Sequence, residues 1–100
     1  MSLHLRKVIA KRVFFSGRVQ GVGFRYETKR IAMGYEVVGT VSNLEDGRVE
    51  LCVMGEDLEV DVFISDIRVE SNLAHHILEY AEETIPSSEM NEVSGFTIVR

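Results

Sequence analysis

The sequence predicts a single α+β domain in which a small sheet packs against two helices. Runs of β-type composition recur along the chain, and two segments between them carry apolar residues at helical spacing instead. At 100 residues, with 45% hydrophobic residues, the chain is long enough to bury one core. We therefore expect residues 1–100 to form one domain without support from a metal or a disulfide.

The first part of the chain predicts a strand, a glycine-rich loop and a helix. Residues 8–16, VIAKRVFFS, are rich in β-branched and aromatic side chains, which favour a strand. A helix is expected from Phe24 to about Met33, and Gly34 is placed to end it as a left-handed cap. The buried face of that helix is expected to contain Phe24, Thr28, Ile31 and Ala32.

The clearest element is a β-hairpin. Two β-type runs, residues 36–43 and 48–54, flank the sequence NLEDG, whose Asp-Gly pair is a hairpin signal. In the second run every other side chain is apolar, as in a strand with one buried face. The apolar positions are Val49, Leu51 and Val53, and the alternating positions are Arg48, Glu50 and Cys52.

The segment after the hairpin fits two structures. Residues 58–62 alternate apolar and acidic side chains, as a strand would. The apolar residues also occupy positions i, i+3, i+4 and i+7 of one helical face, namely Val60, Phe63, Ile64 and Ile67. Glu56 and Asp57 in a first helical turn would meet the positive end of the helix dipole. We predict a helix over roughly residues 56–69.

The last part of the chain predicts two more strands. Residues 75–85 resemble a partly exposed strand, and Phe96 to Val99 form a short final one. The order is therefore β-α-β-β-α-β with a terminal strand. This order is typical of a ferredoxin-like sandwich, an antiparallel sheet of four to five strands with two helices on one face. Such a fold hosts many functions and does not identify one.

The charge of the chain is unevenly distributed. The net charge is −5, yet residues 4–30 carry eight basic residues against Glu27 alone, whereas residues 31–100 carry three basic residues against 15 acidic ones. A basic end can attract nucleic acid or focus a small anion toward the loop within it. The pI near 5.1 argues against nucleic acid, because domains that bind the phosphate backbone are usually basic.

Compartment and assembly follow from what the sequence lacks. No apolar run reaches the length of a secretory signal or a membrane span, so we expect a cytoplasmic protein without a membrane partner. The single cysteine, Cys52, cannot form an internal disulfide, which agrees with a reducing compartment. A monomer is expected, because no long apolar surface stripe remains outside the proposed core.

The stretch GRVQGVGFR, residues 17–25, joins the predicted strand to the predicted helix. A loop that enters a helix N-terminus presents unpaired backbone N–H groups, which together with the helix dipole favour an anion. Gly21 and Gly23 allow positive φ and a close approach of the backbone to a ligand. Arg25 can offer a planar, bidentate donor to a phosphoryl group. The residues expected to bind phosphate are Val19, Gln20, Gly21, Val22, Gly23, Phe24 and Arg25.

Local physics leaves a second interpretation of this loop open, namely a glycine-rich turn with a surface arginine. Two nucleotide motifs fail on spacing. A Rossmann motif requires a third glycine where Tyr26 stands, and a Walker loop requires a Gly-Lys pair, which occurs nowhere in the chain.

Two stretches together resemble the two-part signature of the acylphosphatase family. They are GRVQGVGFR at Gly17–Arg25 and GTVSNLEDGRVE at Gly39–Glu50. The resemblance covers most of the chain from about Lys11 and includes the terminal GFTIVR. It departs where the Gly-Pro turn common after the second helix is replaced by the sequence SNLA, residues 71–74.

The resemblance implies hydrolysis of an acyl phosphate to a carboxylate and inorganic phosphate, without a metal ion, a cofactor or a covalent intermediate. Carried over by position, Arg25 would hold the phosphate and Asn43 would orient the attacking water. The leaving carboxylate has a conjugate acid with a pKa of about 4, so its departure needs no general acid. Oriented amides and one arginine can provide the remaining charge stabilisation.

Other reactive residues fit structural roles better. Cys52 has no histidine beside it in sequence, so a nucleophilic role is not expected. His75 and His76 are expected on a strand, where neighbours point to opposite faces and cannot share a metal. Asn43 taken alone also fits a plain turn asparagine. The acids Asp57, Asp61, Glu82 and Glu83 show no partner pattern, and Phe14, Phe15, Phe24 and Phe63 are core candidates.

Three functions remain open at this point. The first is a small acylphosphatase whose substrates include acetyl or carbamoyl phosphate or acyl-phosphate intermediates on other proteins. The second is a non-catalytic module that binds phosphate or phosphorylated proteins, since similar domains occur within hydrogenase-maturation carbamoyltransferases. The third is an RNA-binding domain of the same fold. Intact Arg25 and Asn43 favour the first, and the acidity of the chain opposes the third.

Overall fold

The computed structural model describes residues 7–99 and has the predicted α+β organisation. Each predicted strand and helix is present, and two short 3-10 turns are added before and after the fourth strand. The elements are β1 (Val8–Gly17), α1 (Phe24–Ala32), β2 (Val37–Asn43), β3 (Val49–Glu56), α2 (Asp57–Ser65) with a π-helical extension (Asp66–Glu70), a 3-10 turn (Ala74–His76), β4 (Ile77–Ile85), a 3-10 turn (Ser87–Met90) and β5 (Phe96–Val99).

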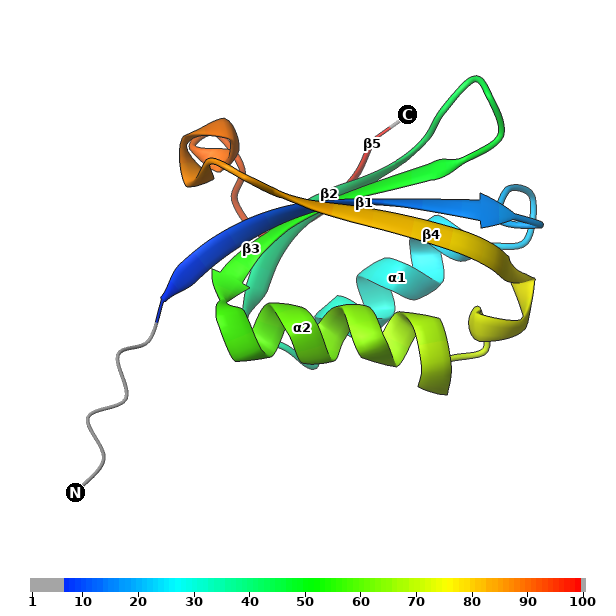
Figure 1. Cartoon of the computed structure of the whole chain (residues 1–100), viewed down its shortest axis with the longest axis horizontal. Helices are drawn as coiled ribbons and strands as arrows, with labels where there is room; N and C mark the ends of the chain where they lie inside the picture. Colours follow the sequence, from blue (N-terminus) through cyan, green and yellow to red (C-terminus); the bar gives the residue numbers. More distant parts are fainter. Residues whose placement is uncertain (1–6, 100) are drawn as a thin grey trace.

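The five strands form one sheet in the order β4-β1-β3-β2-β5, and both helices cover the same face of it (Figure 1). The first four strands pair antiparallel, which confirms the ferredoxin-like prediction. The sheet is not antiparallel throughout as the sequence predicted, because the edge strand β5 pairs parallel to β2. The chain reaches this edge from β4 by way of the second 3-10 turn, whose Met90 packs with Ala10 and Ile85.

The main core lies between the sheet and the helices. The alternation predicted for β3 is confirmed, because Val49, Leu51 and Val53 are fully buried and their neighbours are only partly so. The helix predicted over residues 56–69 is also confirmed, and its apolar face is buried as a unit. That face consists of Val60, Phe63, Ile64 and Ile67. Helical spacing rather than alternation therefore identified the correct structure in the ambiguous segment.

Two local predictions are wrong. Gly34 has no positive φ, so it does not end α1 as a left-handed cap. The helix ends instead in hydrogen bonds between residues three apart. Met33 N–H donates to the Arg30 carbonyl at 3.2 Å, and Gly34 N–H donates to the Ile31 carbonyl at 3.0 Å. Phe14 does not belong to the main core. It lies on the opposite face of the sheet, where the guanidinium of Arg48 sits 4.4 Å from the centre of its ring.

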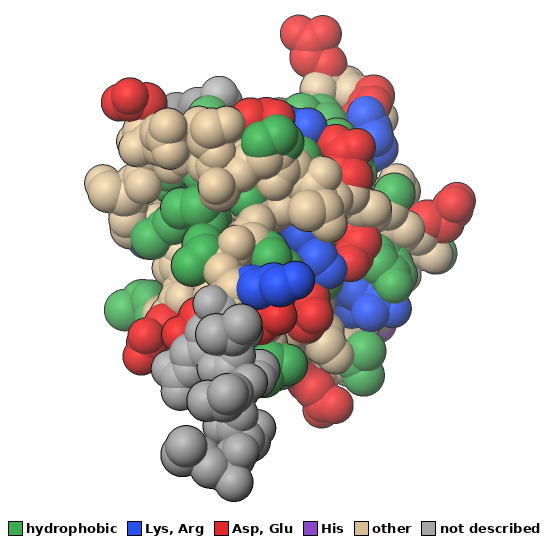
Figure 2. Space-filling model, turned by 60° about the vertical axis from the view of Figure 1, so that its left-hand side comes forward, with side chains coloured by type: hydrophobic (Ala, Val, Ile, Leu, Met, Phe, Trp, Pro, Cys, Tyr) green, Lys and Arg blue, Asp and Glu red, His purple; other side chains and the backbone are tan. Residues whose placement is uncertain are grey.

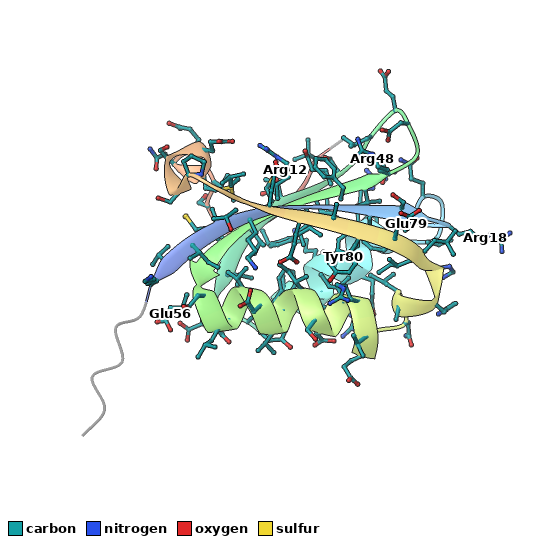
Figure 3. The ribbon with its side chains drawn as sticks, in the orientation of Figure 1. Arg12, Arg18, Arg48, Glu56, Glu79 and Tyr80 are labelled. Carbon is teal, nitrogen blue, oxygen red and sulfur yellow. The ribbon has the colours of Figure 1, made fainter. Side chains whose placement is uncertain are left out.

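Three of the acidic side chains that lacked an evident partner in the sequence, Asp61, Glu82 and Glu83, pair with basic side chains of β1. Lys11 Nζ bonds Asp61 and Glu82, each at 2.9 Å. Arg12, on the face away from the helices (Figure 3), donates to Glu83 at 2.9 Å and to Glu89 at 3.0 Å. Basic side chains bordered by acidic ones are visible at the end of the molecule that carries the N-terminus (Figure 2). Carboxylates therefore offset the charges of Lys11 and Arg12, which lie away from the glycine loop.

Side-chain hydrogen bonds join the segment that follows α1 to the helical segment that begins with α2. The Tyr35 hydroxyl, just after α1, donates to the Asp66 carboxylate at 2.7 Å, and this bond raises the pKa of that hydroxyl. A raised pKa of the folded state means that the stabilisation is fully present below the ordinary tyrosine pKa of 10.0 and is lost as the pH rises through the folded value.

We predict that Tyr35→Phe lowers the free energy of unfolding by about 1 kcal/mol at pH 7. The difference from the parent protein should shrink as the pH rises above 10, because the parent hydroxyl then ionises beside a carboxylate. Urea unfolding at several pH values measures both effects. Tyr26→Phe serves as the control, since the Tyr26 hydroxyl has no hydrogen bond within residues 7–99. If the difference in the free energy of unfolding between Tyr35→Phe and the parent protein stayed constant up to pH 11, the bond from Tyr35 to Asp66 would not be its cause.

Candidate active site

The loop between β1 and α1 takes its shape from its glycines. Gly21 and Gly23 both have φ of 78°, in the left-handed region that side chains other than glycine rarely adopt. A Cβ at either position would meet no atom within 4 Å, so backbone conformation rather than crowding requires glycine here. Gly23 is also the N-cap of α1, with its carbonyl accepting from Glu27 N–H at 3.0 Å.

The backbone N–H groups of this loop are available to a ligand. Within the described part of the chain, the amides of residues 19–26 donate no hydrogen bond, and helical bonding begins only at Glu27. These donors gather where the positive end of the helix dipole lies. A polar group that a folded chain leaves unpaired costs free energy unless water or a ligand satisfies it, so the loop is suited to an anion.

Arg25 and Asn43 meet this loop at a small hollow of about 170 Å³. Arg25 is the second residue of α1 and Asn43 is the last residue of β2, and both are half-buried. Neither side chain forms a hydrogen bond or an ion pair with any other residue of the 7–99 range. By contrast, the guanidinium of Arg12 and that of Arg30 are both engaged by carboxylates.

Two contacts hold the loop in place, one on each side. The Gln20 side chain donates to the carbonyls of Leu44 at 2.8 Å and Arg48 at 2.9 Å, which ties the loop to the hairpin that carries Asn43. On the other side, Arg18 N–H donates to the His76 carbonyl at 2.9 Å. The Arg18 side chain itself extends outward at this end of the molecule (Figure 3).

The hollow contains most of the residues predicted to bind phosphate, and it adds one. It is lined by Val19, Gly21, Gly23, Phe24, Arg25, Tyr26 and Asn43. Val19 and Phe24 are buried in the core and also border the hollow. Gln20 faces the hairpin instead, and Val22 faces a neighbouring hollow. Tyr26 was missed, because in the sequence it served only to exclude a Rossmann motif; its place directly after Arg25 was the available signal.

The other reactive residues lie apart from this hollow. Cys52 faces away from the helices, and burial raises the pKa of its thiol. The expectation that His75 and His76 lie on a strand is wrong, because both belong to the 3-10 turn before β4 and their rings are 4.1 Å apart. Within residues 7–99, three or more potential metal ligands do not come together at any point.

Comparison with known proteins agrees with the signature in the sequence. The sequence model of the acylphosphatase family matches residues 11–98. The chain belongs to the acylphosphatase family. It is an enzyme that hydrolyses the carboxyl–phosphate bond of acyl phosphates to a carboxylate and inorganic phosphate. This result displaces the RNA-binding alternative.

Individual acylphosphatases show how far the similarity extends. The acylphosphatase of Staphylococcus aureus (strain Newman) is 49% identical over 70 residues, which cover 66% of this chain and 78% of the relative. That of Archaeoglobus fulgidus is 48% identical over 61 residues, which cover 61% and 68%. The crystal structure of the Bacillus subtilis acylphosphatase superposes with a TM-score of 0.80 at 29% identity, over 92% of this chain and 99% of the other.

A larger protein contains a similar unit. Full-length HypF, crystallised in a phosphate- and nucleotide-bound form, superposes with a TM-score of 0.77 at 26% identity. The match covers 99% of this chain but only 13% of the HypF chain. In the described part of the present chain, no helix has both the length and the apolar character that crossing a membrane requires.

The clamp made by Gln20 predicts a mutational effect. Gln20→Leu removes both hydrogen bonds to the hairpin and should lower the free energy of unfolding by about 1 to 2 kcal/mol. We expect kcat for acyl phosphate hydrolysis to fall roughly 10- to 100-fold, because the hairpin is no longer held in register with the loop. Inhibition by phosphate should weaken but persist, since the left-handed glycines and the bond from Arg18 N–H to the His76 carbonyl still shape the loop. Glu45→Ala in the same hairpin turn is the control. An unchanged kcat in Gln20→Leu would show that the Gln20 hydrogen bonds stabilise the fold without supporting catalysis.

Cys52 provides a second prediction. Because its thiol has a raised pKa, the protonated and unreactive form dominates near neutrality. We expect Cys52→Ser to leave kcat/KM for acyl phosphates unchanged, and iodoacetamide at pH 8 to label the folded protein more slowly than the urea-unfolded protein. Loss of turnover in this variant would require a catalytic thiol.

Proposed function

We propose that Arg25 and the loop amides hold the phosphoryl group while Asn43 positions the attacking water. The observation that carries this proposal is that three kinds of donor, each without a hydrogen-bond partner among residues 7–99, meet at one hollow: loop amides, the Arg25 guanidinium and the Asn43 carboxamide. A guanidinium matches the oxygens of a phosphoryl group in a planar, bidentate way. The amides supply further donors that need no reorganisation during the reaction.

The reaction needs few groups because its leaving group is good. The water oxygen forms a bond to phosphorus on one side as the bond from phosphorus to the carboxyl oxygen breaks on the other. The carboxylate departs with the electron pair of the broken bond, and the proton released by water passes to solvent. Since the conjugate acid of the leaving group has a pKa of about 4, no acid has to protonate it. Charge on the equatorial oxygens is stabilised by the amides and by Arg25, so we propose a metal-independent reaction.

Asn43 suits the role assigned to it. Its carboxamide is neutral and offers both a donor and an acceptor, so it can hold a water molecule in a defined orientation. A carboxylate at this position would repel the phosphoryl dianion. The Gln20 bonds to Leu44 and Arg48 hold the hairpin beside the loop, which keeps Asn43 within reach of the phosphoryl group.

We further propose that residues 1–100 form one domain, which is monomeric and cytoplasmic. Its small-molecule partners are acyl phosphates, which it hydrolyses, and inorganic phosphate, which it binds. The single cysteine agrees with a reducing compartment. The net charge of −5 disfavours association through like-charged surfaces and disfavours nucleic acid as a partner. Light scattering coupled to size exclusion at several protein concentrations tests the monomer.

Two substitutions test the proposed catalytic roles. Arg25→Gln and Asn43→Ala should each lower kcat/KM for benzoyl phosphate roughly 10²- to 10³-fold, about 3 to 4 kcal/mol of transition-state stabilisation, while the fold stays intact. Circular dichroism checks the fold, and hydrolysis is followed with and without EDTA.

Matched controls change the same residue types elsewhere. Arg68→Gln removes a guanidinium that stacks on Tyr80, and Asn91→Ala removes an exposed carboxamide. Both controls should retain activity. Parent-like turnover in both site variants would refute the assignment, and loss of activity in EDTA would refute metal independence.

A further inference from the structure

A second hollow adjoins the one at the phosphate loop. Its volume is about 430 Å³, and it shares Gly23 and Tyr26 with the smaller hollow that contains Arg25 and Asn43. Its other walls include Val22 from the loop, Leu73 from the segment after α2, and the histidine pair of the 3-10 turn. The two hollows therefore meet at the first turn of α1.

We propose that this second hollow binds the acyl group of the substrate and favours compact apolar acyl groups, aromatic ones above all. The inference rests on the proposed function, because it takes its direction from the side on which water attacks. It assigns Tyr26, Val22 and the turn that carries His75 and His76 to substrate selection.

The direction of the reaction places the acyl group here. In an in-line displacement, the attacking water and the leaving group lie on opposite sides of phosphorus. The end of β1 lies between the hairpin side, where Phe15 pairs with Val49, and the β4 side, where Gly17 pairs with Ile77. Asn43 belongs to the hairpin side, so a water molecule held by Asn43 directs the leaving carboxylate toward the turn before β4. The second hollow lies at that turn.

The walls of the hollow suit an apolar group. Tyr26 and Val22 are 69% and 40% exposed, so large apolar surface is left uncovered beside the phosphate loop. Leu73, only 3% exposed, adds a buried apolar side chain to the wall. The rings of His75 and His76 lie 4.1 Å apart and provide flat surface next to it. An aromatic acyl group can pack against Tyr26 and gain the stabilisation typical of ring pairs.

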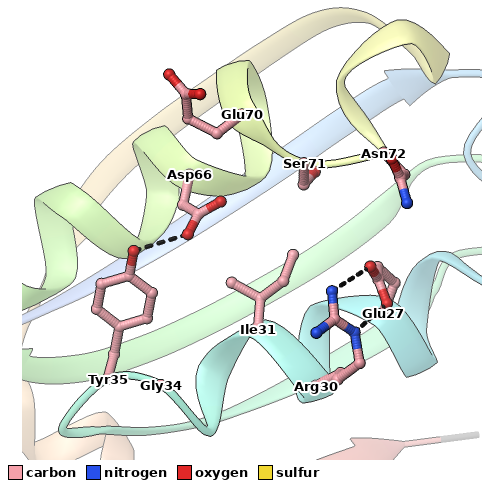
Figure 4. Close-up of a pocket in the computed structure, with 9 residues that line it drawn as sticks. All are labelled: Glu27, Arg30, Ile31, Gly34, Tyr35, Asp66, Glu70, Ser71 and Asn72. Atoms are coloured by element: carbon pink, nitrogen blue, oxygen red, sulfur yellow. Dashed lines mark hydrogen bonds and ion pairs between the residues drawn. The ribbon is translucent and has the colours of Figure 1, made fainter.

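The far end of the hollow limits the size of the acyl group. There it meets a third hollow of about 470 Å³, with which it shares Glu27, Arg30 and Asn72 (Figure 4). This region is polar: Arg30 and Glu27 form a two-pronged ion pair at 2.6 and 2.7 Å, and Asp66 accepts from the Tyr35 hydroxyl. A long alkyl chain would have to displace water from these charged groups, which is unfavourable.

The experiment compares three substrates in the parent protein and in Tyr26→Ala. The parent should hydrolyse benzoyl phosphate with a higher kcat/KM than either acetyl or octanoyl phosphate. In Tyr26→Ala the ratio of kcat/KM for benzoyl phosphate to that for acetyl phosphate should fall about tenfold, the usual effect of losing apolar contact in a binding pocket. Tyr26→Phe should keep the parent ratio, because the ring remains.

A control on the same helix separates the subsite from a general change in α1. Met33 is 81% exposed and does not line the second hollow, so Met33→Ala should leave the ratio unchanged. An unchanged ratio in Tyr26→Ala would overturn the subsite, and equal kcat/KM for octanoyl and benzoyl phosphate in the parent would overturn the size limit. Failure of the proposed function gives a different result, namely undiminished hydrolysis of all three substrates by Asn43→Ala.

Discussion

The backbone amides between β1 and α1, which donate no hydrogen bond to any residue from 7 to 99, are the feature on which the rest of the site depends. They stay open because glycine residues hold a left-handed conformation and because the loop is fastened on both sides. The Gln20 carboxamide binds two carbonyls of the hairpin, and Arg18 N–H binds the His76 carbonyl. Without these fastenings, a glycine-rich segment would lose its defined shape, since glycine restricts the backbone least of all residues.

The sheet order gives this loop its two neighbours. Because β1 is flanked by β3 and β4, the loop that follows β1 has the hairpin on one side and the turn before β4 on the other. The hairpin brings Asn43, and the turn brings the walls of the second hollow. In the proposed mechanism, this one central loop holds the phosphoryl group between the side that positions water and the side that binds the acyl group.

Ion pairs distinguish the basic side chains away from the loop from the arginine beside it. Lys11 and Arg12 are offset by carboxylates of α2, β4 and the turn after β4. Arg25 keeps no such partner in the 7–99 range, although the chain as a whole is acidic. The acidic surface repels an anion, whereas the Arg25 guanidinium attracts it to the hollow beside the loop.

The sequence by itself determined the elements and the identity of the loop. Helical spacing in residues 60–67, alternation in β3 and the glycine positions before α1 depend on near neighbours, so each could be predicted locally. It misplaced Phe14 and the histidine pair, whose surroundings come from distant strands. Only the tertiary structure decided that Gln20 clamps the hairpin and that Tyr26 borders two hollows. Those contacts join residues far apart in the chain, and the order of strands that creates them leaves no trace in local periodicity.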